Sequence, residues 1–124
     1  MKLYLKEAKL NASVTNVNPY VVCHVGFFEW KSPAPMEKDL SALLWSELEY
    51  FKYDVFKPEE LIVIEMKDKD SDRGTKVIGR CEVPCHFFAQ PGGRDEWLEL
   101  NLLGKPIGTI RIASEFSGRE AKKA

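Results

Sequence analysis

One stretch of the chain sets its fold class. It reads Leu61-Ile62-Val63-Ile64-Glu65-Met66 and runs on into Lys67-Asp68-Lys69-Asp70. Nearly every one of its first six residues is apolar, as in a central β-strand that is covered on both faces. Lysine and aspartate then alternate, which is typical of a solvated connection. The stretch therefore predicts a buried strand that leads into a charged loop.

Short segments of strand character lie on both sides of this stretch. Apolar residues alternate with polar ones at Phe51, Tyr53 and Val55, which indicates a half-buried strand. In the whole chain we predict eight strands, near residues 3–8, 20–25, 40–44, 51–55, 61–66, 77–83, 97–100 and 108–113. Seven prolines and eight glycines lie mostly between them. This pattern predicts an all-β protein with one helical turn near residues 86–90.

Length and charge limit the class of protein further. The chain has 124 residues, 18 basic and 19 acidic side chains, and a net charge of −1. The length predicts one domain, and the near-neutral charge argues against a general nucleic-acid binder. No apolar run reaches the roughly 18 residues that a membrane-spanning helix needs. We expect a cytoplasmic domain over residues 1–116, followed by a charged flexible tail, or the start of a linker, at 117–124.

Three cysteines and two histidines raise the question of zinc. Cys23 and His24 are neighbours in a predicted strand, so their side chains point to opposite faces. Cys81 also lies in a predicted strand, whereas zinc knuckles place their cysteines in turns. We expect small buried cysteines and surface histidines. The sequence also lacks a nucleophile motif, a phosphate-binding loop and a dinucleotide fingerprint, so we expect no enzyme activity.

The order of several motifs resembles the C2 domain family. In chain order the motifs are Asn18-Pro19-Tyr20-Val21, Trp45 with Glu47, Phe51, the stretch 61–70, Ile78-Gly79, Val83-Pro84 and Trp97-Leu98-Glu99-Leu100. The resemblance implies an eight-stranded antiparallel Greek-key β-sandwich. The strand at 108–113 comes last, which implies the type II permutation. Trp45 and Trp97 hold positions that are usually in the core, and the long spacing from Trp45 to Phe51 implies a bulge.

Some members of the resembled family bind calcium through five aspartates from their first and third loops. The resemblance therefore asks whether this chain keeps those aspartates. Here the first loop, residues 11–18, carries no charge, and Asn18 stands where an aspartate belongs. The third loop keeps Asp68 and Asp70, whereas Lys76 aligns with the remaining aspartate. Asp72 could substitute only in a remodelled loop. The site is thus degenerate.

Charge in the third loop argues against a strong calcium site. From residue 67 to 76 the chain carries four cations and three carboxylates, a net charge of +1. A calcium ion is coordinated by six to eight oxygen ligands, several of them from charged carboxylates. We expect calcium to bind weakly or not at all, so no cofactor is required. The residual calcium candidates are Asp68, Asp70 and Asp72.

Two functional hypotheses follow from the resemblance. The first is a non-catalytic, calcium-independent interaction module of a larger protein that docks a protein partner or scaffold, with Trp30 as a candidate contact. The second is a peripheral domain that targets anionic phospholipid membranes, with weak calcium binding through the third loop. Its candidate contacts are Lys69, Arg73, Lys76, Val14 and Val17. The alternative is that these cations have no binding role and only neutralise the neighbouring aspartates. Either hypothesis implies a cytoplasmic protein, peripheral at membranes or associated with the cytoskeleton.

Overall fold

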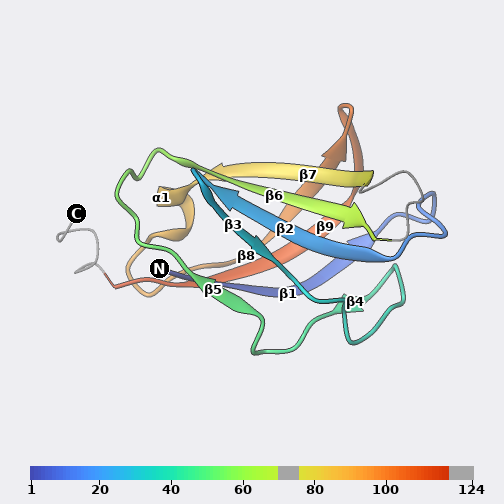
Figure 1. Ribbon diagram of the computed structural model, residues 1–124, viewed down its shortest axis with the longest axis horizontal. Helices are drawn as coiled ribbons and strands as arrows, with labels where there is room; N and C mark the ends of the chain where they lie inside the picture. Colours follow the sequence, from blue (N-terminus) through green and yellow to red (C-terminus); the bar gives the residue numbers. More distant parts are fainter. Residues whose placement is uncertain (70–75, 118–124) are drawn as a thin grey trace.

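The computed structural model describes residues 1–69 and 76–117 (Figure 1). These ranges form nine strands and one short helix. In chain order they are β1 (Lys2–Leu10), β2 (Pro19–Val25), β3 (Phe28–Lys31), β4 (Leu43–Leu44), β5 (Tyr50–Lys52), β6 (Leu61–Asp68), β7 (Lys76–Pro84), α1 (Cys85–Phe88), β8 (Asp95–Leu102) and β9 (Lys105–Glu115). Every strand pairing is antiparallel.

The strands form one curled sheet whose two halves pack against each other. The first half has the order β3-β2-β6-β7, and the second has β8-β9-β1 with both β4 and β5 on the free edge of β1. A single paired position, Arg80 with Asn101, joins the halves between β7 and β8. Because β4 and β5 are two pieces of one interrupted edge strand, the expected eight-stranded sandwich is confirmed. The last strand, β9, lies between β8 and β1, as the type II order requires.

The core lies between the two halves. Alternate residues of β6 (Ile62, Ile64 and Met66) face residues of β1 and β9 such as Leu3 and Ile112, all in one cluster of buried side chains. The central place of β6 is as predicted. However, β6 is not covered on both faces as predicted, because Val63 on its outer face is only half-buried. Charged side chains, rather than another layer of structure, lie around it.

The division of the chain into strands differs from the prediction in one missed strand and in two strands that are shorter than expected. β3 was missed because its residues, Phe28-Glu29-Trp30-Lys31, follow Gly26 too closely to stand out as a separate segment. Gly26 has φ of +58°, and Val25 pairs with Phe28, so a two-residue turn forms a hairpin there. A glycine at such a turn is the signal that identifies hairpins in sequence. The predicted strands at 40–44 and 51–55 shorten to β4 and β5.

The expected bulge lies between β4 and β5. The N–H of Trp45 donates to the carbonyl of Lys6, and the N–H of Leu5 donates to the carbonyl of Glu49. Two neighbouring residues of β1 are thus matched by the two ends of a longer segment, and residues 46–48 loop out. Trp45 itself is 3% exposed and lies in the core, as expected.

Trp97 corrects an expectation. The resemblance placed it in the core, but its side chain is 42% exposed. Leu100 of the same strand is fully buried and Leu98 packs against the core. Because successive residues of a strand face opposite sides, Trp97 must face outward. There the Lys9 ammonium lies 5.0 Å from the centre of the indole ring.

The strand ends gather several connections at one end of the sandwich. β1, β6 and β8 end there, and β2, β7 and β9 begin there, at the right of Figure 1. We call this the loop end and define it as residues 11–18, Lys69, Lys76 and residues 101–106. At the opposite end lie α1, the β2–β3 turn and the connection from β5 to β6 (Figure 1).

Candidate functional site

Asp68 lies at the border of the loop end, where β6 finishes opposite the start of β2. Its Oδ1 accepts a 3.0 Å hydrogen bond from the backbone N–H of Asn18. The N–H of Lys69 in turn donates to the carbonyl of Asn18 at 2.9 Å. The carboxylate is half-buried and held against the backbone of the first loop. This contact ties the first loop to the end of β6.

The donor set at this place is poor for calcium. Asp68 is the acid that contacts the first loop, and Asp39 lies next to Leu40, whose carbonyl accepts a hydrogen bond from Leu10 at the end of β1. Asp70, Asp72 and Arg73 lie outside the described residues. In the described ranges no group of three or more His, Cys, Asp or Glu residues is placed to hold a metal ion. Calcium needs six to eight oxygens with several carboxylates among them. The described residues do not fit such an ion.

The predicted contact residues separate into two groups. Lys69 and Lys76 are exposed, and both lie at the loop end beside the Asn18 contact. Val14 and Val17 are at the same end but are half-buried against the core. Trp30 lies elsewhere: it is half-buried on β3, and its ring centre is 5.3 Å from that of Phe51. Trp30 therefore helps to close the sandwich between β3 and β5.

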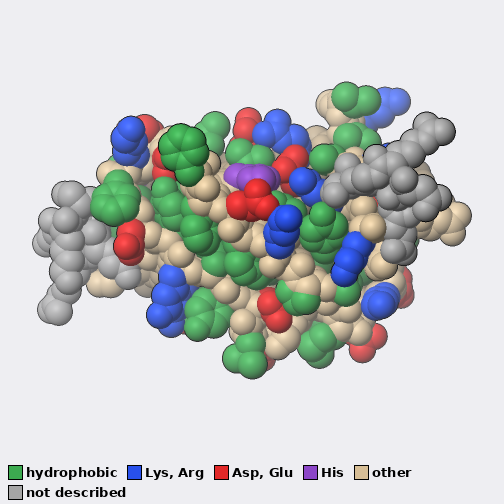
Figure 2. Space-filling view, in the orientation of Figure 1, with side chains coloured by type: hydrophobic (Ala, Val, Ile, Leu, Met, Phe, Trp, Pro, Cys, Tyr) green, Lys and Arg blue, Asp and Glu red, His purple; other side chains and the backbone are tan. Residues whose placement is uncertain are grey.

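The sequence reasoning missed the turn between β8 and β9. Leu103 is 96% exposed, Leu102 is also exposed, and Lys105 follows after Gly104. Figure 2 shows hydrophobic and basic side chains together at the tip of this projecting hairpin. The signal was present as Leu-Leu-Gly-Lys between two predicted strands. The glycine marks the turn, but the leucines do not mark an exposed site, because leucine normally indicates burial.

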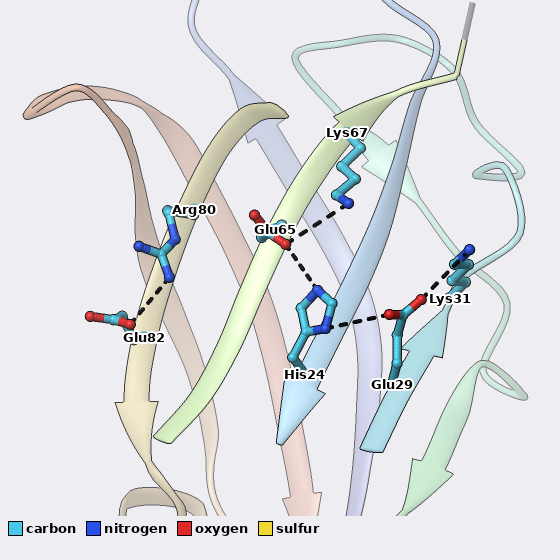
Figure 3. Close-up of polar contacts among 7 residues, drawn as sticks. All are labelled: His24, Glu29, Lys31, Glu65, Lys67, Arg80 and Glu82. Atoms are coloured by element: carbon cyan, nitrogen blue, oxygen red, sulfur yellow. Dashed lines mark hydrogen bonds and ion pairs between the residues drawn. The ribbon is translucent and has the colours of Figure 1, made fainter. Parts of the chain in front are cut away.

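Charges on the outer face of β2, β3, β6 and β7 neutralise one another (Figure 3). His24 lies between Glu65, at 2.9 Å from Nε2, and Glu29, at 3.6 Å from Nδ1. The ion pairs that complete this face are Lys31–Glu29, Lys67–Glu65 and Arg80–Glu82. By contrast, no ion pair within the described ranges involves Lys69, Lys76 or Lys105. The positive charges of these three lysines at the loop end are therefore not neutralised by an ion pair within the described ranges.

A surface groove of about 700 Å³ runs over the outer face of β1 and β9. Arg111 projects into it and donates hydrogen bonds to Asp95 at 2.9 and 2.7 Å and to Glu7 at 2.7 Å. The Arg111 guanidinium lowers the pKa of Asp95 below its usual value. Since two carboxylates already occupy the guanidinium, the groove offers no obvious site for an anionic ligand.

The cysteines and histidines lie as expected. Cys23 and Cys85 are buried, Cys81 is half-buried, and His86 is exposed. His24 and Cys23 point to opposite faces of β2, as strand geometry requires. Burial raises the pKa of Cys81 to about 12 and that of Cys85 to about 11, and a nearby Glu60 adds to the second shift. These thiols are therefore protonated and poor metal ligands at neutral pH.

A sequence profile of the C2 domain family matches residues 2–100. Among solved structures the chain is similar to the paired C2 domains of extended synaptotagmin 2 (22% identity, TM-score 0.73, 92% of this chain and 39% of that one). It is similar to a single C2 domain of plant extended synaptotagmin 1 (17%, 0.72, 94% of each chain). Human GIVD cytosolic phospholipase A2 is also similar (14%, 0.67, 90% of this chain and 16% of that one). No curated protein matches by sequence.

The chain thus spans about two fifths of the extended synaptotagmin 2 structure and all but a few residues of the plant domain. In the described ranges no helix is long and apolar enough to cross a membrane. These identities are below 25%, so the likeness to solved structures bears on the fold. The family itself rests on the profile match.

Proposed function

Because the chain belongs to the C2 domain family of membrane- and protein-interaction modules, we propose that it is a non-catalytic module that docks on anionic membranes without calcium. The observation that carries the proposal is the charge at the loop end. Lys69, Lys76 and Lys105 are exposed there and take part in no ion pair within the described ranges.

The lysines supply a favourable energy of useful size. A lysine near an anionic membrane contributes about 1 kcal/mol, so three contribute about 3 kcal/mol, or roughly a hundredfold in partitioning. Asp68 opposes them only weakly, because it is half-buried and accepts the hydrogen bond from Asn18. The outer sheet face, where each cation has a carboxylate partner, gives no comparable attraction.

Calcium independence is the second half of the proposal. Asn18 stands where calcium-binding members carry an aspartate, and its backbone N–H already occupies Oδ1 of Asp68. Lys76 replaces another acid of the family pattern and lies directly across the strand ladder from Asp68. At this end, the fixed positive charge of the lysines attracts anionic headgroups, as a bound calcium ion does in other members.

The test is co-sedimentation with phosphatidylcholine vesicles, with and without phosphatidylserine, in the presence of a calcium chelator. We expect binding only with phosphatidylserine, and a steep loss at high salt. Lys69→Glu with Lys76→Glu removes and reverses two charges and weakens binding at least about thirtyfold. The control, Lys52→Glu with Lys57→Glu, changes net charge equally at exposed positions away from the loop end and leaves binding near the wild-type level.

Two results would contradict the proposal. One is wild-type protein that stays in the supernatant with phosphatidylserine vesicles. The other is equal loss in the two double variants, since then only net charge matters and the loop end has no special role. Binding that appears only after calcium is added would overturn calcium independence alone.

Docking of a protein partner is the second candidate, and a specific surface favours it. Phe27 is fully exposed at the β2–β3 turn, and Phe56 is 68% exposed in the connection that precedes β6. The turn lies against that connection, because a Cβ on Gly26 would stand 2.9 Å from the Glu60 carboxylate. Exposed aromatic side chains at this end suit a protein interface. Replacing both by serine would abolish such docking without affecting vesicle binding.

A further inference from the structure

The turn between β8 and β9 carries a leucine that the fold does not need. Leu102 pairs with Lys105, so Leu103 and Gly104 form a two-residue turn, with φ of +52° and +80°. Turns with two positive φ values favour Asn-Gly or Gly-Gly, because Cβ crowds the backbone there, glycine has no Cβ, and the asparagine amide can hydrogen-bond locally. A leucine in this conformation needs an explanation other than local backbone preference.

Solvent exposure adds to the cost of this leucine. Leu103 is 96% exposed, so its side chain gains nothing from the core of its own domain. Leu102 beside it is exposed too. The turn therefore presents two apolar side chains to water from a position that the chain could fill more favourably with polar residues. Backbone strain and apolar exposure at one residue both point to a contact outside the domain.

The charges around the turn indicate what kind of contact. The six residues 101–106, Asn-Leu-Leu-Gly-Lys-Pro, include no acid and one exposed lysine. Lys76 and Lys69 are exposed at the same end of the sandwich. Two leucines with lysines behind them match a bilayer, whose apolar interior lies beneath anionic headgroups. The long lysine side chain can then remain at headgroup level while the leucines lie deeper.

The turn is held in place before any contact is made. Its base is tied to the first loop, since Asn11 donates its backbone N–H to Ile107 at 2.8 Å and its side-chain amide to Pro106 at 3.1 Å. β9 also lies very close to β1, because a Cβ on Gly108 would stand 2.2 Å from the carbonyl of Lys9. A rigid element loses little conformational entropy on binding.

We propose that the β8–β9 turn is an apolar wedge that inserts into the bilayer, with Leu103 deepest, Leu102 beside it and Lys105 at the headgroups. This inference rests on the proposed membrane function and adds the element that enters the membrane. It also links the wedge to the strand order, because the turn exists only where the closing strand comes after β8.

The first test uses Leu103→Asn, which suits the left-handed backbone and removes the apolar side chain. With phosphatidylcholine–phosphatidylserine vesicles and a chelator, we expect about tenfold weaker partitioning. The melting temperature should stay the same or rise, so a loss of binding cannot come from unfolding. The matched control is Phe27→Ser, which removes an equally exposed apolar side chain at the opposite end and should leave partitioning unchanged.

The second test measures depth. In Leu103→Trp, tryptophan emission should be quenched by brominated lipids more strongly than in wild type, whereas in Phe27→Trp it should not. If wild-type protein binds the vesicles but Leu103→Asn binds equally well, or Leu103→Trp is not quenched, the wedge is wrong and the lysines alone account for binding. If wild type does not bind, the proposed function fails first. If Leu103→Asn leaves vesicle binding unchanged but abolishes binding to a protein partner, the turn is a protein contact and the wedge is wrong.

Discussion

The backbone N–H of Asn18 donates a 3.0 Å hydrogen bond to Oδ1 of Asp68, and this contact joins the first loop to the end of β6. A calcium site at this place would need further carboxylates from both loops. The first loop instead gives a backbone N–H to Asp68, and Lys76 stands opposite the same aspartate in the ladder. Within the described residues, the first loop and the end of β6 are therefore joined by the chain's own hydrogen bonds.

This closure predicts that calcium does not stabilise the wild-type protein. The melting temperature should be equal in a chelator and in submillimolar calcium, because an ion that does not bind the native state cannot stabilise it. Asn18→Asp with Lys76→Asp restores two acids of the family pattern beside Asp68. In that variant we expect calcium to raise the melting temperature by several degrees and the chelator to abolish the rise.

A suitable control for this experiment is Gln90→Glu with Lys57→Asp, which makes an equal change in net charge at exposed positions away from Asp68. It should show no calcium response. A rise of several degrees in the wild type would contradict the prediction, and it would show that Asp70 or Asp72 completes a site that Asp68 begins.

The strain at Leu103 predicts a stabilising substitution. A left-handed backbone costs a residue with a branched side chain about 1–2 kcal/mol, and asparagine adopts it more readily. Leu103→Asn should therefore raise the free energy of unfolding by about 1 kcal/mol, measured by denaturation in urea. Gly104→Ala in the same turn should lower it. If Leu103→Asn is less stable than wild type, the leucine has a structural role and the wedge loses its main support.

The sequence revealed most of the strands because their alternation is strong. Phe51 and Val55, which are both buried, alternate with polar neighbours and indicated the inner face of their segment directly. The stretch 61–66 indicated a buried strand by its nearly continuous apolar character, which did not show that only one of its faces is covered. β3 was missed because a two-residue turn at Gly26 leaves no loop between it and β2. Short hairpins of this kind are visible only when the turn residue is recognised together with its flanking strands.

The site was predictable only in part, for a different reason. Lys69 and Lys76 could be placed at the loop end because they flank a recognisable loop. The exposure of Leu103 could not be predicted, because leucine normally indicates burial and its backbone angles depend on how β8 pairs with β9. The outward place of Trp97 was decided by Leu98 and Leu100 in the same strand, so alternation was a better guide than residue size.

Burial of the cysteines predicts low reactivity. Burial raises the pKa of Cys81 to about 12 and that of Cys85 to about 11, and it also raises the pKa of Cys23, which is more deeply buried than Cys81. Since the thiolate is the reactive form, the folded protein should react slowly with a disulfide reagent at pH 8. Three thiols should react at once in guanidinium chloride. Rapid reaction of the folded protein would show that the sandwich opens readily.

The network of Arg111, Asp95 and Glu7 predicts a dependence of stability on pH. Arg111 holds the pKa of Asp95 below its unfolded value, so the pair stabilises the fold above that unfolded pKa and loses its effect as the pH falls through the lower folded value. Arg111→Met should therefore lower the melting temperature clearly at pH 7. At pH 2 to 3, about one to two units below the ordinary aspartate pKa, the difference from wild type should shrink.

Two controls separate the charge of Arg111 from its packing. The groups of the network are partly exposed, so added salt should reduce the difference between Arg111→Met and wild type at pH 7. Lys52→Met, at an exposed position of β5 outside this network, should show the same small change in melting temperature at both pH values. A difference between Arg111→Met and wild type that grows as the pH falls would mean that Arg111 acts through packing and not through its charge.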